Sequence, residues 1–496
     1  MRQFAFAIWL LFTCAWSLGH ADVQDHFETL KAKPRALYTF LKDMPKGGEL
    51  HYHYDGSVYA ETMLQLGIKS NLCINPSAMC AQFCQPHSAD KSVKTVLKNS
   101  TLFQKTVHTW SMQDFVPRTA SGHDHFFAIF PKIGAFYQYL KGPLLAAILQ
   151  KAAAQHELYL EIIAFGFPEE DEYAKLIRKT PTLAQKRAVL IANPAFQRRV
   201  QHMIDDSATF LPQAHTALHC ASQPQQAACH IKVNFQAYVR RVQSIDSVFA
   251  QALAGFMAAE HSPTIVGINL VDIEDSPVAQ RDYVAQMEIF SFLHQQYPNV
   301  HIALHAGELF PKNIAHHKVI APIRDAIMIG HAERIGHGVD IQDEPNPVAL
   351  AEMMANKNIA VETNLTSNRW VLGVKGKQHP LKFYLQHHVP VVLSTDDEGI
   401  LRTTLSREYF NAVVQHDLDY DTLKQINRNA LTYGFMPGQS LWQNPDQAIA
   451  VKECDMPNSS SCQNFIKRSP KATLQWQLEQ DLARFEKQWY GRPMHP

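Results

Sequence analysis

Short apolar runs alternate with longer helix-like stretches along most of the chain. Eight of the runs have the length expected for buried strands. They cover residues 48–53, 158–164, 232–235, 264–271, 300–305, 334–336, 359–362 and 389–395. Strands that alternate with helices form a parallel sheet covered by helices, and eight of them close a barrel. The pattern therefore predicts an α/β fold, a (β/α)8 TIM barrel.

The stretches outside these runs predict what surrounds the barrel. Residues 68–122 are rich in Cys, Ser, Lys and Asn and indicate an insertion after the first strand. Helical stretches after Arg402 predict additional C-terminal helices. We expect a signal peptide at residues 1–21 and an N-terminal helical segment at 22–45. The barrel should span residues 46–440, and a C-terminal loop and helix should span 441–496.

The composition is that of a globular enzyme. The 496 residues are 46% hydrophobic and 19% charged, and the formal net charge is zero. No block of basic residues is present, which argues against nucleic acid or an anionic membrane as the main partner. A chain of this length buries a large core and suits one barrel with insertions. The expected partner is a small molecule.

The first residues have the pattern of an export signal. Arg2 precedes an apolar stretch over about residues 4–18, and the small residue Ala21 suits cleavage by signal peptidase. The stretch is shorter than the roughly 20 residues that a membrane helix needs. A lipid anchor at Cys14 is the alternative, but Thr13 is a poor residue before a lipidated cysteine. We expect a secreted or periplasmic protein with no second membrane span.

The cysteines are typical of an oxidising compartment, because those that follow the signal form three local clusters. Two local disulfides are expected, Cys220–Cys229 and Cys454–Cys462. In the third cluster two cysteines should pair and leave one thiol free or blocked; its members are Cys73, Cys80 and Cys84. A zinc finger is disfavoured, because no second Cys/His pair follows at finger spacing.

The first barrel run contains a His-x-His pair, His51 and His53. Side chains alternate along a strand, so both imidazoles point to one side and can bind one metal ion. Such a pair alone is more often two unrelated strand residues. Further candidates each follow a later apolar run, where a barrel strand delivers its functional residues. They are His305, His337, Asp396 and Asp397. Together these positions predict a zinc hydrolase site.

These residue types suit one chemistry. Three neutral imidazoles and a carboxylate hold zinc, which lowers the pKa of bound water to about 7. Attack of hydroxide on an aromatic amidine carbon needs a proton at the neighbouring ring nitrogen, and Glu308 is placed to deliver it. His337 and Asp397 then orient the water and the substrate. The Pro-Cys-x-x-Cys element of the cytidine deaminase zinc site and the His-Glu-x-x-His motif of the common metalloproteases are absent.

Four blocks resemble, in the same order, the signature of the adenosine deaminase family. They are His51–Gly56, His305–Glu308, Gly336–Gly338 and Ser394–Asp397. Their spacing and the export signal are most similar to the secreted branch, the adenosine deaminase-related growth factors. The resemblance covers roughly residues 44–402. It implies a metal-dependent barrel that hydrolyses the purine nucleosides adenosine or 2'-deoxyadenosine, releasing ammonia.

The resemblance also implies roles for individual residues. One zinc ion per chain would be held by His51, His53, His305 and Asp396. Glu308 would donate a proton to purine N1, and His337 would hold and help deprotonate the water. Asp397 would bond purine N7, and Asp55 would bond the ribose.

Two blocks depart from the family pattern. Where the family reads Gly-x-Asp-Leu-x-Gly-x-Glu, Gly267–Glu274 has Asp272 at the second glycine, whose backbone N–H is expected to meet purine N3. Glu362–Asn368 keeps only the ends of Glu-x-Cys-Pro-x-Ser-Asn. Two alternatives therefore stay open: a related amidohydrolase acting on a modified purine or another C–N bond, or a catalytically silent binding protein. The segment before the barrel is shorter than the dimerisation segment of the growth-factor branch, so the chain is expected to be a monomer or a homodimer.

Overall fold

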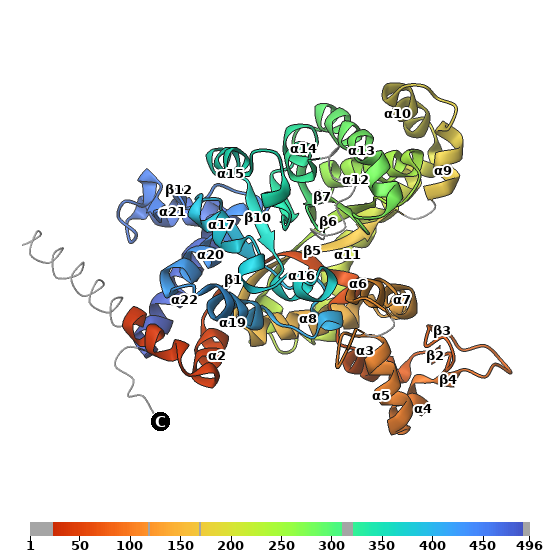
Figure 1. Cartoon of the computed structure of the whole chain (residues 1–496), viewed down its shortest axis with the longest axis horizontal. Coiled ribbons are helices and arrows are strands. Elements are labelled where there is room, and N and C mark those ends of the chain that lie inside the picture. The colour runs from red at the N-terminus through yellow and green to blue at the C-terminus, as the bar shows by residue number, and fades with distance from the viewer. Residues whose placement is uncertain (1–22, 118–119, 168–169, 310–320, 490–496) are drawn as a thin grey trace, which may run out of the picture.

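The computed structural model describes residues 23–117, 120–167, 170–309 and 321–489. Eight parallel strands form one sheet in the order β1-β5-β6-β7-β8-β9-β10-β11 (Figure 1). Their bounds are β1 Lys46–His53, β5 Glu157–Gly166, β6 Lys232–Arg240, β7 Ile265–Val271, β8 His301–Ala306, β9 Arg334–His337, β10 Ala360–Thr363 and β11 Val391–Leu393. Each predicted apolar run overlaps one of these strands.

The first and last strands meet and bring the sheet close to a closed barrel. His53 N–H donates to the carbonyl of Asp396 at 3.0 Å, and Asp396 N–H donates to the carbonyl of His51 at 3.2 Å. The chain therefore folds as the predicted (β/α)8 barrel. Apolar side chains fill most positions of the strands because helices cover the sheet from outside.

The helices that follow the central strands start at well-defined caps. The hydroxyl of Ser244 accepts the backbone N–H of Ser247, and the hydroxyl of Ser276 accepts that of Ala279. The covering helices are α8 Lys141–Ala154, α11 Pro194–Ala217, α12 Ile245–His261, α13 Pro277–Gln296, α14 Pro322–Met328, α15 Pro347–Asn356, α17 Leu381–Gln386, α19 Leu405–His416 and α20 Tyr420–Tyr433. Shorter helices α16 Leu365–Val371 and α18 Glu398–Leu401 lie at the carboxyl ends of β10 and β11.

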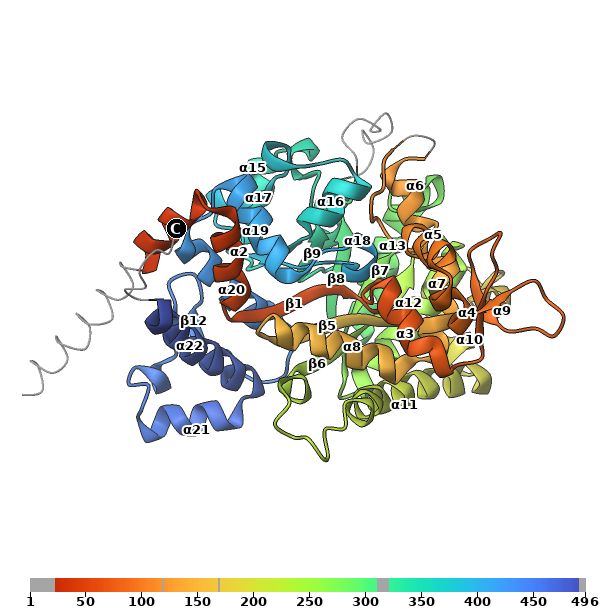
Figure 2. The ribbon, with the colours of Figure 1, turned by 90° about the horizontal axis from the view of Figure 1, so that it is seen from below.

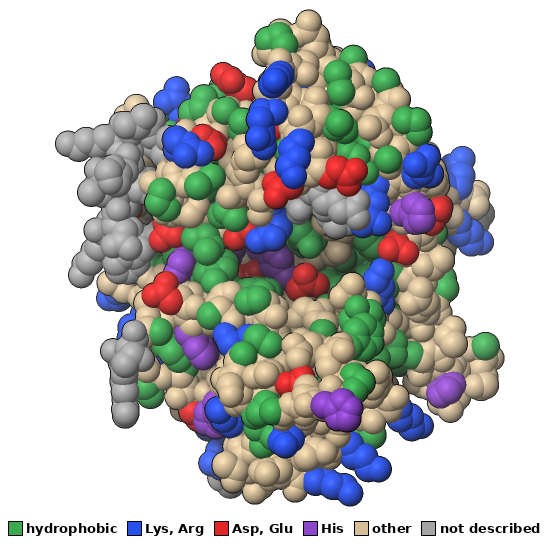
Figure 3. All heavy atoms as spheres, turned by 90° about the vertical axis from the view of Figure 1, so that its right-hand side faces the viewer, with side chains coloured by type: hydrophobic (Ala, Val, Ile, Leu, Met, Phe, Trp, Pro, Cys, Tyr) green, Lys and Arg blue, Asp and Glu red, His purple; other side chains and the backbone are tan. Residues whose placement is uncertain are grey.

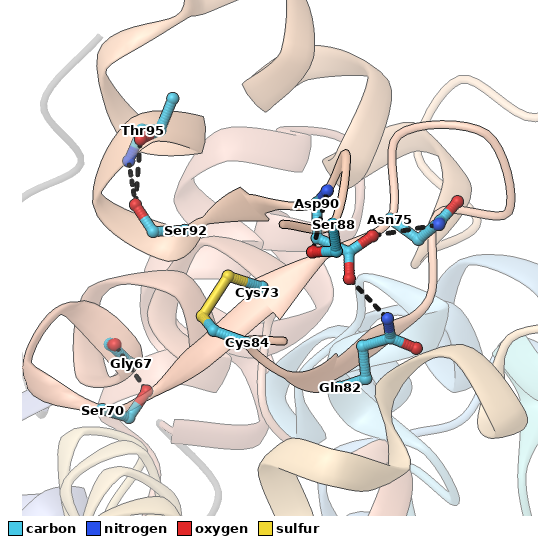
Figure 4. Close-up of a disulfide and its surroundings, with 10 residues drawn as sticks. All are labelled: Gly67, Ser70, Cys73, Asn75, Gln82, Cys84, Ser88, Asp90, Ser92 and Thr95. Atoms are coloured by element: carbon cyan, nitrogen blue, oxygen red, sulfur yellow. Dashed lines mark hydrogen bonds between the residues drawn. A yellow bond between two sulfur atoms is a disulfide. The ribbon is translucent and has the colours of Figure 1, made fainter. Parts of the chain in front are cut away.

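A large segment lies between β1 and β5 and projects from one side of the barrel (Figures 1 and 2). It contains α3 Ala60–Leu66, α4 Val93–Lys98, α5 Ser100–Thr109, α6 Gly122–Phe127, α7 Phe130–Tyr139 and a small antiparallel sheet of β2 Leu72–Ile74, β3 Ala81–Phe83 and β4 Lys91–Ser92. Figure 4 shows the disulfide Cys73–Cys84 and the Asp90 carboxylate, which accepts hydrogen bonds from Asn75 and Gln82. Cys80 is the free thiol of this cluster.

The other expected disulfides, Cys220–Cys229 and Cys454–Cys462, are also present. The first follows the excursion of α9 Glu170–Ile177, α10 Leu183–Ile191 and α11. The second joins the segment after β12 Trp442–Asn444 and β13 Ile449–Ala450 to α21 Ser460–Arg468.

The two ends of the described chain pack together. The helical residues 23–31 and α2 Pro34–Asp43 lie beside the terminal helix α22 Pro470–Trp489 (Figure 2). Phe40 makes edge-to-face ring contacts with Tyr420, Phe485 and Trp489. None of the helices in the described ranges has both the length and the apolar character needed to span a bilayer. The predicted signal peptide lies outside the described residues.

Candidate metal centre and active site

The carboxyl ends of the barrel strands carry the histidines and acids singled out in the sequence. His51 and His53 lie near the end of β1, His305 lies on β8, and His337 ends β9. Asp396 follows β11. His337 and Asp396 have positive φ angles of 67° and 65°, so the backbone turns sharply where it leaves each strand. Residues far apart in the chain therefore converge at one end of the barrel.

Three separations between donor atoms suit ligands that share a single metal ion. His53 Nε2 is 3.1 Å from His305 Nε2. Asp396 Oδ1 is 3.4 Å from His51 Nε2 and 3.3 Å from His53 Nε2. Ligands about 2.0 Å from a tetrahedral metal ion are separated by roughly 3.3 Å. Within the described part of the chain, His51 Nε2 is also buried without a hydrogen-bond partner, as expected of an atom that coordinates a metal.

A second arrangement of donors is also close enough for coordination. Ligand atoms of His51, His305, His337 and Asp396 all lie within 4.8 Å of one another. His337 Nε2 is 3.9 Å from Asp396 Oδ2 and 3.7 Å from Glu308 Oε2. The distances alone therefore leave His53 and His337 as competing candidates for one coordination position.

Buried partners orient two of the imidazoles. His51 Nδ1 lies 2.8 Å from Glu362 Oε2, and His305 Nδ1 lies 2.8 Å from Asn269 Oδ1. Both oxygens accept, so each Nδ1 is the donor and each Nε2 keeps a lone pair directed at the centre. Arg334 holds Glu362 in turn, through a 2.6 Å contact from its Nε.

The electrostatic environment keeps most of these imidazoles neutral. Burial lowers the pKa of His53 to about 4 and that of His305 well below its ordinary value, which favours metal coordination. His51 differs, because burial opposes its charge but Asp396 and Glu362 outweigh burial and raise its pKa to about 9. A metal ion at His51 would take the place of that proton.

Glu274, which is paired with Arg241, holds the backbone of Glu308 beside the centre. The backbone N–H groups of Gly307 and Glu308 donate to the two oxygens of Glu274 at 3.0 and 2.9 Å. Arg241 lies 3.3 Å from Glu274 and is fully buried. Burial, reinforced by Asp396, raises the pKa of Glu308 to about 8, so its carboxyl carries a proton near neutral pH.

Asp397 and Asp55 line the same cavity. Asp397 Oδ1 is buried and has no hydrogen-bond partner among the described residues. A Cβ at Gly56 would lie 1.7 Å from that oxygen, so only glycine allows the close approach of this turn. Burial, with Asp396 beside it, raises the pKa of Asp397 well above its ordinary value. The Asp55 side chain is exposed within the cavity.

The cavity has a volume of about 590 Å³. Its apolar wall comes mainly from Phe126, Phe127, Phe130 and Ile163. The site residues that line it are His53, Asp55, His305, Glu308, His337, Asp396 and Asp397. Figure 3 looks at this side of the molecule and shows a hollow with histidine and acidic side chains inside it. An aromatic ring of substrate size would meet aromatic side chains on one side and hydrogen-bonding groups on the other.

Asp272 lies at the rim of this cavity, with its carboxylate turned away from the base. Its backbone has a φ of 85°, the left-handed region that glycine adopts most easily. The carboxylate accepts from Arg240 Nε at 2.9 Å and from the Ile273 N–H at 3.0 Å. The structure thus shows the sidechain paired at the rim rather than directed at the other site residues.

The residues that hold the site in place were not expected from the sequence. Asn269, Glu274, Glu362 and Asn368 are all buried and contact a site residue or its backbone. A signal for two of them was present. Asn269 and Glu362 are polar residues within apolar strand runs, and a polar group buried in a strand needs a partner.

Comparison with known proteins agrees with this geometry. Residues 209–443 match the family model for adenosine deaminase. This part of the chain is similar to the adenosine deaminase family. It includes His305, Glu308, His337, Asp396 and Asp397, whereas His51 and His53 precede it.

Individual adenosine deaminases match over shorter lengths. The enzyme of Enterococcus faecalis is 32% identical over 140 residues, 28% of this chain and 38% of that protein. The enzyme of Aliivibrio fischeri is 29% identical over 215 residues, 42% of this chain and 59% of that protein. The matches thus span less than two thirds of these curated relatives. The N6-methyl-AMP deaminase of Arabidopsis thaliana has the same fold, with a TM-score of 0.51 over 89% of this chain and 98% of that chain at 18% identity.

Proposed function

We propose that this protein is an exported, zinc-dependent adenosine deaminase that converts adenosine or 2'-deoxyadenosine to the corresponding inosine and ammonia. One observation carries the proposal. The nitrogens of His51, His53 and His305 and an oxygen of Asp396 converge at the base of a cavity that also presents Glu308 and Asp397. The donor set suits zinc, because imidazole nitrogens and a carboxylate at tetrahedral spacing are its preferred protein ligands.

When bound, the zinc ion would supply hydroxide by lowering the pKa of a coordinated water to about 7. The chain's own residues would do the rest. Glu308, protonated near neutral pH, would deliver its proton to purine N1. Asp397 would donate to purine N7, because its raised pKa favours the protonated form. Asp55 would bond the ribose, and His337 would hold the attacking water.

A second candidate is a deaminase or related amidohydrolase that acts on a modified purine. The observation that favours it is the pairing of Asp272 with Arg240 at the cavity rim. The Asp272 N–H is proposed to meet purine N3. The added ion pair changes which substituents the site accepts along that edge of the purine. A catalytically silent binding protein is the third candidate. It is disfavoured because every proposed catalytic position holds a competent residue.

A substrate panel tests the proposal. The purified mature protein would be assayed for ammonia release from adenosine, 2'-deoxyadenosine, AMP, N6-methyl-AMP, cytidine and guanosine, with methylamine release measured for the methylated compound. Preference for adenosine and 2'-deoxyadenosine supports the main proposal. Preference for a modified or phosphorylated adenine supports the second candidate. Release of amine from none of them would contradict both.

We further propose that the chain is secreted or periplasmic and most similar to the growth-factor branch of the family. The disulfides Cys73–Cys84, Cys220–Cys229 and Cys454–Cys462 support an oxidising compartment. The proposed partner is a small purine nucleoside, with neither nucleic acid nor a membrane involved. A monomer and a homodimer are both compatible with this function.

A further inference from the structure

A chain of three buried side chains leads from the start of α17 to the candidate active site. The Leu381 N–H donates to His379 Nδ1 at 3.2 Å. His379 Nε2 lies 3.0 Å from Asn368 Oδ1, and Asn368 Nδ2 lies 2.9 Å from His337 Nδ1. The three side chains are at most 4% exposed, so water does not compete for these bonds.

The donor and acceptor of every hydrogen bond in this series follow from the first donor, the Leu381 N–H. A backbone N–H can only donate, so His379 Nδ1 must accept and must carry no proton. The proton of His379 is then on Nε2, which donates to Asn368. An amide that accepts through its oxygen at one end presents its NH2 group at the other. Asn368 therefore donates to His337 Nδ1.

We propose that Asn368 and His379 are positioning residues that fix His337 in the tautomer protonated at Nε2. His337 Nε2 faces the cavity beside Glu308 and Asp396. This tautomer is the opposite of that of His51 and His305, whose Nδ1 atoms donate to Glu362 and Asn269. The local sequence differs here from the family pattern, because Asn364 and Leu365 stand where the family reads Cys-Pro.

The tautomer decides what His337 can do. A neutral imidazole protonated at Nε2 has no lone pair there, so it neither coordinates a metal nor accepts a proton from water through that atom. His53 therefore takes the contested coordination position. Within the proposed function, on which this step rests, His337 donates a hydrogen bond to the attacking water oxygen and orients it. The general-base role that the resemblance implied for His337 is excluded by this assignment.

Burial supports the neutral state of His379. It lowers the pKa of His379 to about 3, with nearby His416 contributing in the same direction. The Leu381 N–H adds an independent constraint, because a protonated Nδ1 would face another donor. The N–H itself belongs to the first turn of α17, where backbone donors have no partner within the helix.

The test reads the tautomer directly. Protein labelled with 15N-histidine would be studied by two-bond 15N–1H correlation in the zinc-loaded and the metal-free form, with the His337 signal assigned from His337→Gln. We expect protonation at Nε2 in the wild type in both forms. In Asn368→Asp, the carboxylate can only accept, so Nδ1 of His337 should become protonated and kcat should fall about tenfold or more with little change in KM. A wild-type signal protonated at Nδ1 would overturn the proposal.

Substitutions at His379 keep the test decisive if Asn368→Asp does not fold. His379→Gln can still donate to Asn368 Oδ1, so it should keep the wild-type tautomer and kcat within about threefold. His379→Leu removes the donor and should give a mixed His337 signal and a lower kcat. The control is His416→Gln, which changes a buried imidazole 5.8 Å from the His379 ring without touching the hydrogen-bond chain. If His379→Leu leaves the His337 signal unchanged, the proposal is wrong.

The spectra also separate this inference from the proposed function. If the protein shows the expected tautomer but no deaminase activity, the positioning role of Asn368 and His379 stands and the proposed function is wrong. If the protein is fully active but His337 is protonated at Nδ1, the proposed function stands and the positioning role is wrong.

Discussion

His53 Nε2 lies 3.1 Å from His305 Nε2, although 252 positions separate the two residues in the chain. Two neutral imidazole nitrogens at this distance need a proton or a metal ion between them, because two lone pairs repel. Glu362 and Asn269 hold His51 and His305 through Nδ1, so the Nε2 atom of each remains available to a metal ion. The arrangement is that of a preformed metal site, and it yields the first prediction.

The purified protein should contain about one zinc ion per chain, and removing it should abolish turnover. Removal should also lower Tm, because a ligand present at a thousand times its Kd stabilises the folded state by about 4 kcal/mol. Metal analysis, calorimetry with and without chelator, and re-addition of zinc measure this. Active protein that contains no transition metal would contradict the assignment.

Replacing Glu308 by Gln should lower kcat by about 10² or more while leaving zinc bound, because an amide of the same shape cannot deliver a carboxyl proton. Glu333→Gln is the matched control, since Glu333 pairs with His301 at the start of β8, away from the cavity. Steady-state kinetics and metal content measure both variants. Near-normal kcat in Glu308→Gln would remove this residue from the mechanism.

Asp272→Gly should change kcat/KM for adenosine by less than about threefold, because the carboxylate is paired with Arg240 rather than directed at the cavity base. Glycine also suits the positive φ of this position, so little stability should be lost. Asp272→Ala keeps a Cβ in the left-handed backbone and should cost about 1 kcal/mol. Steady-state kinetics measure kcat/KM, and urea unfolding measures stability, for the wild type and both variants. A tenfold rise in kcat/KM for Asp272→Gly would show that the charge reaches the substrate.

The pair His123–Asp275 joins α6 to the loop after β7, with His123 Nε2 3.3 Å from Asp275 Oδ1. The hydrogen bond to Asp275, helped by Asp124, outweighs burial and raises the pKa of His123 to about 9. Because the unfolded pKa is about 6.5, the stabilisation is complete below that pH and is lost as pH rises through about 9.

His123→Gln should therefore be less stable than wild type at pH 6 and equally stable near pH 10. Urea unfolding across this range measures the difference, and Asp275→Asn should show the same dependence because it removes the other partner. A difference that does not vary with pH would show that the charge of His123 is not involved.

Peptide mapping of the non-reduced, exported protein should recover the three disulfides, with Cys80 as the reduced thiol. Cys80→Ser should leave the map and Tm unchanged, whereas Cys73→Ser should lower Tm by removing a crosslink. Free thiols at Cys220 and Cys229 in exported material would contradict the proposed compartment.

The sequence by itself determined the barrel and the positions of its candidate site residues. Strands buried on both faces must be almost continuously apolar, so all eight could be recognised from short runs such as 264–271 and 389–395. In a parallel barrel the carboxyl ends of all strands lie at the same end. Residues that end or directly follow those runs, such as His305 and Asp396, were therefore predicted to meet without knowledge of any contact.

Only the tertiary structure decided which atoms face one another. The choice of Cys84 as the partner of Cys73, the turn of Asp272 toward Arg240 and the hydrogen-bond chain from Leu381 to His337 all depend on contacts between separate elements. Residue type and spacing do not encode such contacts, because a side chain's rotamer and protonation respond to neighbours that folding brings together. His337 shows this most clearly: its position follows from the sequence, whereas the location of its proton follows from Asn368 and His379.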